Sequence, residues 1–260
     1  MEPAGVFSVL SKCFSVIDDD EWEAVRAEGA WFDFLESVRR LLAEPEAFAD
    51  SEAQADARVG ARPQGSPTRI APPLSDYLAT CELEAVLTPP AAHEKRAFAA
   101  AHFTGGLAQT ALPVESLYRD ERGWLRKACR QRDAGGESGS YMGPTARYMQ
   151  TQCDALGLSV PQAFGAWPDH LSLELDMVAV LLRSGMAKAA CGFAAERFAW
   201  LSVYRMRLLE LGDEALFYVA LIDLIVGIVS ELPEASSGLW SYGSIDASEQ
   251  EGRRQCQRML

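Results

Sequence analysis

The segment Trp167–Glu174 carries the side chains of this chain that are best suited to chemistry. Asp169 and His170 are adjacent, and Glu174 follows one helical turn after the histidine. A proline followed by an aspartate is typical of a helix start, so Asp169 is predicted to cap the first free backbone N–H groups. We therefore expect Asp169 and His170 at an exposed helix entrance, from which both could project into a neighbouring groove.

Three roles are open to these residues on chemical grounds. Asp169 could be only a cap, with His170 an ordinary surface histidine. His170 could instead be the general base of a small enzyme, which would need a nucleophile or a metal beside it. A metal site built from Asp169, His170, Glu174 and Asp176 is disfavoured, because one helix cannot turn all four toward a single ion. The sequence has no nucleophile or phosphate-binding motif, so we predict no catalytic residue, no metal and no cofactor.

Two further segments could form a binding surface. In the run 112–118 the proline favours an extended start, after which Val114 and Tyr118 could line an apolar groove and Glu115 could meet a cation. A structural loop packed by Tyr118 is the alternative. Phe103 ends a helical pattern, which two glycines then stop, and packing in the core is the default expectation for this phenylalanine.

Helical periodicity dominates the elements that must position these segments. Sustained period-2 alternation is absent, so the predicted fold class is all-α, a single bundle of about seven to ten helices. Residues 1–232 are predicted to form one domain with a long loop at 50–75, and residues 233–260 a polar, partly disordered tail. Asp20 is expected to cap the second helix, with Phe32 on its apolar face. The predicted helices span 5–17, 21–43, 75–88, 90–103, 144–157, 169–186, 188–211 and 213–231.

The charge balance restricts the partners. The net charge is −13, which disfavours nucleic acid and anionic membranes and favours a cationic peptide. The six cysteines show no zinc-site spacing, as expected of reduced thiols in the cytosol. The apolar run Leu216–Val229 is shorter than the roughly 20 residues of a membrane span, and the N-terminus lacks the pattern of an export signal. A soluble cytoplasmic protein without stable membrane insertion is therefore predicted.

These segments, in this order, resemble the TorD/DmsD/NarJ family of redox-enzyme maturation chaperones. The family pattern has an aromatic–glycine helix end, then a proline-led ESxY-like loop with a following glycine, then a PxDH-type helix start. Arg197 lies where a later family helix usually has a histidine. The likeness covers about residues 75–230. The matching positions are Phe103-Thr104-Gly105, Pro113 to Tyr118 with Gly123, and Pro168-Asp169-His170-Leu171.

The resemblance implies a TorD-like helical bundle that is not an enzyme. It implies a cytoplasmic chaperone that binds the twin-arginine signal peptide of a molybdenum-containing oxidoreductase and assists cofactor loading before export. The partners would be that signal peptide and the catalytic subunit, with the chaperone a monomer or a homodimer. An assembly scaffold that binds a folded redox subunit without a signal peptide is the alternative. The expected peptide-binding residues are Phe103, Pro113, Val114, Glu115, Ser116, Tyr118, Trp167, Asp169, His170 and Glu174.

Overall fold

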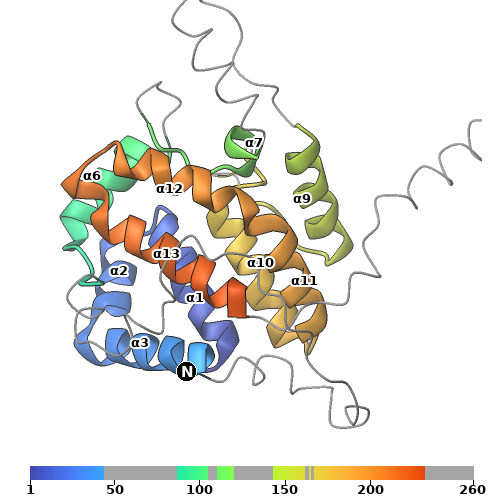
Figure 1. Ribbon diagram of the computed structural model, residues 1–260, viewed down its shortest axis with the longest axis horizontal. Helices are drawn as coiled ribbons and strands as arrows, with labels where there is room; N and C mark the ends of the chain where they lie inside the picture. The colour runs from blue at the N-terminus through green and yellow to red at the C-terminus, as the bar shows by residue number, and fades with distance from the viewer. Residues whose placement is uncertain (44–86, 105–109, 120–142, 162–163, 165–166, 232–260) are drawn as a thin grey trace, which may run out of the picture.

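The computed structural model describes residues 1–43, 87–104, 110–119, 143–161, 164 and 167–231 (Figure 1). Within these residues the regular secondary structure is helical, apart from one isolated antiparallel bridge between Val114 and His170. The predicted all-α class is therefore confirmed. The helices are α1 (Pro3–Phe14), α2 (Asp19–Arg26), α3 (Glu28–Ala43), α6 (Ala92–His102), α7 (Glu115–Tyr118), α9 (Pro144–Ala155), α10 (Leu171–Arg183), α11 (Ala187–Arg197), η3 (Phe198–Trp200), α12 (Leu201–Leu209), η4 (Asp213–Ala215) and α13 (Leu216–Glu231).

The centre of the bundle is formed by α1, α10 and α13. The helix α1 packs along α10, while α13 packs against α3, α11 and α12. In Figure 1 the helices α9, α10 and α11 lie on one side of the molecule, and α2, α3 and α6 lie on the other. The apolar run Leu216–Val229 forms most of α13 and contributes to the core, as predicted. Over the part of the chain that the structure describes, no helix has both the length and the apolar character needed to cross a membrane.

An aromatic cluster joins α1, α6 and α13. The rings of Phe98 and Tyr218 are stacked with their centroids 4.1 Å apart, and Phe103 meets Tyr218 edge-on at 5.3 Å. Phe14 lies 5.9 Å from Phe103. Phe103 is the C-cap of α6 and is buried, so the expectation that it packs in the core is confirmed.

The prediction of one continuous helix over 21–43 is wrong. The helix is interrupted at Ala27, where the backbone leaves the helical conformation (φ −51°, ψ 133°), and this interruption separates α2 from α3. The cap is Asp18 rather than Asp20, since the Asp18 side chain accepts from the Glu21 N–H at 2.7 Å. Phe32 is 55% exposed, while its neighbour Trp31 is buried. Leu35 and Val38 are buried as the helical spacing predicted, so the departure is confined to the start of α3.

The remaining helices are close to their predicted positions. The predicted helix 188–211 is divided into α11, η3 and α12, and Gly212 then adopts a left-handed backbone conformation (φ 79°) before η4. Three cysteines are described, and Cys13, Cys153 and Cys191 are all free and buried. The other three cysteines, the predicted helix at 75–86, the 50–75 loop and the 233–260 tail lie outside the described residues.

Candidate functional site

The loop before α7 and the start of α10 are joined through their backbones. Val114 and His170 form the antiparallel bridge. Around it, the Glu115 N–H donates to the Asp169 carbonyl at 3.0 Å, and the Leu171 N–H donates to a carbonyl of the loop at 2.8 Å. Two segments more than 50 residues apart in the sequence are thereby held in register. The structure thus brings together two of the segments in which site residues were predicted.

Asp169 does not cap its own helix, contrary to the sequence prediction. Its Oδ2 accepts from the Ser116 N–H at 2.9 Å and from the Thr145 Oγ1 at 3.0 Å. The cap of α10 is His170, whose Nδ1 accepts from the Ser172 N–H at 3.2 Å. Because the helix begins at Leu171, the aspartate precedes the cap and its side chain is free to reach toward α7 and α9.

His170 is buried, with 1% of its surface exposed, so its predicted place at an exposed helix entrance is wrong. Its Nδ1 also lies 2.8 Å from the Ser172 Oγ, and the Phe164 ring centroid is 4.9 Å away. Burial lowers the pKa of His170 to about 3, although the Phe103 backbone opposes this shift. A histidine with so low a pKa is a weak base, and its burial separates it from solvent, so the geometry does not favour the enzyme alternative.

Two buried glutamates meet next to this histidine. Burial raises the pKa of Glu174 well above its ordinary value, and the neighbouring Glu115 raises it further. The pKa of Glu115 is also raised by burial, but Arg197 and Arg119 oppose this shift. We conclude that Glu174 is the protonated member and hydrogen-bonds to the Glu115 carboxylate. Trp200 completes the arrangement, since its Nε1 donates to Glu174 Oε2 at 3.3 Å.

Arg197 is the residue that sequence reasoning missed. Its Nη2 pairs with Glu115, and the two side chains are 1% and 0% exposed. Its guanidinium also lies 4.6 Å from the centre of the Tyr148 ring on α9. Glu115 was expected to meet a cation of a bound peptide, but in the structure it meets two cations of its own chain, Arg197 and Arg119. The one available signal was an arginine at the position where the resembling family usually has a histidine.

Most of the predicted peptide-binding residues are therefore enclosed rather than open to solvent. Only Ser116 and Trp167 keep partial exposure, and the others are buried. Tyr118, for example, stacks on the Trp200 ring with centroids 5.6 Å apart. The described residues contain no group of three or more His, Cys, Asp or Glu side chains arranged to hold a metal. We call Glu115, Asp169, His170, Glu174 and Arg197 the polar cluster.

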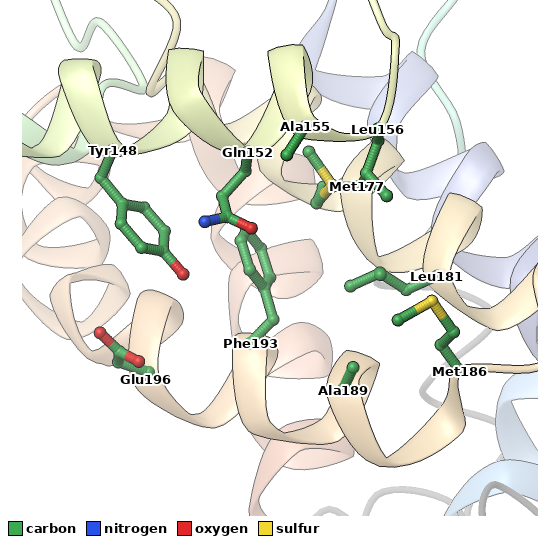
Figure 2. A pocket seen from close by; sticks show the side chains of 10 residues that line it. All are labelled: Tyr148, Gln152, Ala155, Leu156, Met177, Leu181, Met186, Ala189, Phe193 and Glu196. Carbon is green, nitrogen blue, oxygen red and sulfur yellow. The ribbon is translucent and has the colours of Figure 1, made fainter. Parts of the chain in front are cut away.

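An open hollow lies beside this cluster, between α9, α10 and α11. It has a volume of about 90 Å³. In Figure 2, Tyr148 and Gln152 project into it from α9, while Leu181 and Phe193 face it from α10 and α11. Met186, at the start of α11, is 45% exposed at its edge. We call this hollow the α9–α11 groove. No motif pointed to it, because it is built from ordinary apolar residues of three separate helices.

Comparison with known proteins identifies a family. A family model described as nitrate reductase delta subunit matches residues 74–211, which is more than half of the 260 residues. No curated protein and no solved structure matches the chain significantly. The matched range includes every member of the polar cluster and every residue that lines the α9–α11 groove.

Proposed function

Because the chain belongs to the nitrate reductase delta subunit family, a family of redox-enzyme maturation chaperones, we propose that it binds the twin-arginine signal peptide of a molybdenum-containing oxidoreductase. In this proposal the protein works in the cytoplasm and holds its client while the cofactor is loaded, before export. It catalyses no reaction itself. Its partners are the signal peptide and the catalytic subunit that carries it.

The family match is the observation that carries this proposal. The match includes the two segments that the backbone bridge joins, and it ends near the end of α12. The charge of the chain supports a cationic ligand, because a net charge of −13 speeds the approach of an arginine-bearing peptide and repels phosphate backbones. A surface hollow with an apolar lining supports a ligand that also has apolar side chains.

A role without catalysis fits the chemistry of the polar cluster. His170 is neutral and enclosed, and the acidic pair formed by Glu115 and Glu174 is occupied by Arg197 and Trp200. Groups held in this way stabilise the fold rather than meet a substrate. We therefore propose that the predicted peptide-binding residues act mainly by fixing the helices around them. Ser116 and Trp167 are the two that could touch a peptide directly.

Titration calorimetry tests the proposal. The full chain would be titrated with a synthetic leader peptide of the molybdenum oxidoreductase encoded in the same genome, and with the catalytic subunit with and without its leader. Micromolar binding of the leader, about −8 kcal/mol, is the expected result. Binding of the subunit that survives removal of the leader, with no binding of the leader alone, would favour the assembly-scaffold alternative.

A further inference from the structure

The two ends of the α9–α11 groove differ in polarity. One end is formed by Tyr148 and Glu196, which carry polar groups, and the other by Leu181 and Met186, which are apolar, with Gln152 between them (Figure 2). We infer that this groove receives the apolar run of the client's leader peptide, with an arginine of the peptide beside Glu196. This inference rests on the proposed function and names the surface on which that function takes place.

The size of the groove indicates what it can hold. A volume of about 90 Å³ is well below the roughly 300–1,000 Å³ of small-molecule sites. It suits one or two aliphatic side chains that project from a peptide lying across the surface. Met177 and Met186 contribute flexible, polarisable walls, which adapt to different apolar side chains. An apolar helix docked through residues at i and i+3 or i+4 would use such a surface.

Charge complementarity indicates which end of the groove receives the arginine of the peptide. Glu196 is partly exposed at the rim, and no salt bridge joins it to another residue in the described part of the chain. Its neighbour Arg197 is turned inward and committed to Glu115. An incoming arginine would therefore find, next to an apolar floor, a rim carboxylate that forms no ion pair with any described residue. A leader in which the arginine pair precedes an apolar run matches this order of polar and apolar surface.

The polar cluster holds the three walls of the groove. Asp169, which precedes α10, is hydrogen-bonded to Thr145 on α9. Arg197 at the end of α11 lies against Tyr148 of α9, which is itself a wall of the groove. Glu174 on α10 accepts from Trp200 of η3, the short helix that directly follows α11. The cluster is therefore a set of positioning residues, and it links the groove to the segments that first indicated a binding function.

Filling the groove is the decisive experiment. Ala189 lies in the groove on α11, while Ala195 is exposed on the same helix and does not line the groove. Fluorescence anisotropy would measure the affinity of a labelled leader peptide for Ala189→Trp and for the matched control Ala195→Trp. We expect Ala189→Trp to raise the Kd at least about tenfold, which corresponds to about 1.4 kcal/mol, and Ala195→Trp to leave it within about twofold. Circular dichroism and Tm would verify that both variants are folded.

The outcomes separate the inference from the proposed function. If the wild type binds the leader and both tryptophan variants bind it equally well, the groove is not the binding surface, but the proposed function stands. If the wild-type protein does not bind the leader, the proposed function fails and the inference fails with it. Weakening by Ala189→Trp alone supports both.

The role of Glu196 is tested with two peptides. Glu196→Gln should weaken binding of the Arg-Arg leader about three- to tenfold and leave an otherwise identical Gln-Gln leader unaffected. An equal effect on the two peptides, or none on either, would exclude an arginine at Glu196.

Cross-linking tests the orientation of the bound peptide. A photoreactive benzophenone at the end of the apolar run far from the arginines should cross-link to Met186. One placed next to the arginines should cross-link to Tyr148 or Gln152, and the reverse pattern would contradict the inferred direction.

Discussion

The polar cluster and the α9–α11 groove are neighbours with opposite characters. The cluster contains three acids, a histidine and an arginine, and all five are at most 1% exposed. The groove is open and consists mostly of alanine, leucine, methionine and aromatic side chains. The residues with the richest chemistry are thus internal supports, while residues without distinctive chemistry form the accessible surface. Reactive side chains indicate a function only where the tertiary structure leaves them open to a ligand.

Loss of the buried ion pair should have the largest effect. Glu115→Ala leaves Arg197 charged and enclosed without its carboxylate, which should lower the free energy of unfolding by about 3–5 kcal/mol. Urea denaturation followed by circular dichroism would measure this loss. The matched control is Asp223→Ala, which breaks the partly exposed bond to Arg205 and should cost under about 1 kcal/mol. Equal losses in the two variants would show that the cluster is not a special support.

The next largest effect is expected at Asp169. Asp169→Ala leaves the Ser116 N–H and the Thr145 hydroxyl without their acceptor, so the free energy of unfolding should fall by about 2–3 kcal/mol. Thr145→Val removes only one of the two bonds and should cost about 1 kcal/mol. Thermal and urea unfolding would compare the variants. An Asp169→Ala protein as stable as the wild type would show that Asp169 does not stabilise the packing of α7 and α9.

A smaller, pH-dependent effect is expected at Glu174. Its pKa in the folded protein is raised above the ordinary value of 4.5. The folded state therefore keeps a proton that the unfolded chain releases, and the stabilisation is lost as the pH rises above about 4.5. Glu174→Gln mimics the protonated form at every pH. We expect the Tm of this variant to exceed that of the wild type at pH 8, and the difference to shrink toward pH 4.5. A difference that does not change with pH would contradict a raised pKa.

The smallest effect on stability is expected in the groove. Ala189 is only half-buried, so Ala189→Trp should change the free energy of unfolding by under about 1 kcal/mol. Chemical denaturation would measure this change beside the peptide affinity of the same variant. The comparison of the two regions predicts large losses of stability for the cluster and a loss of binding with intact stability for the groove. A strong loss of stability in Ala189→Trp would contradict this difference between the cluster and the groove.

The sequence alone predicted the helical class and the positions of several helices. Apolar spacing within single segments predicted α9, α10 and α13 to within a few residues, because this periodicity is local to each helix. The run Leu216–Val229 was assigned to the core from its length. The order of the Phe103, Pro113 and Pro168 segments indicated the family, which the match over residues 74–211 then showed. The break between α2 and α3 was missed because Ala27 and Glu28 are both compatible with a helix.

Only the tertiary structure decided which residues are enclosed. The partner of Glu115 is Arg197, 82 residues away, and the donors to Asp169 lie 53 and 24 residues away at Ser116 and Thr145. No local pattern encodes such pairs, because they depend on how whole helices pack. The groove has the same origin, since its walls come from three helices that meet only in the folded chain. The sequence determined the helices and the family, and long-range packing decided which side chains support the fold and which face a partner.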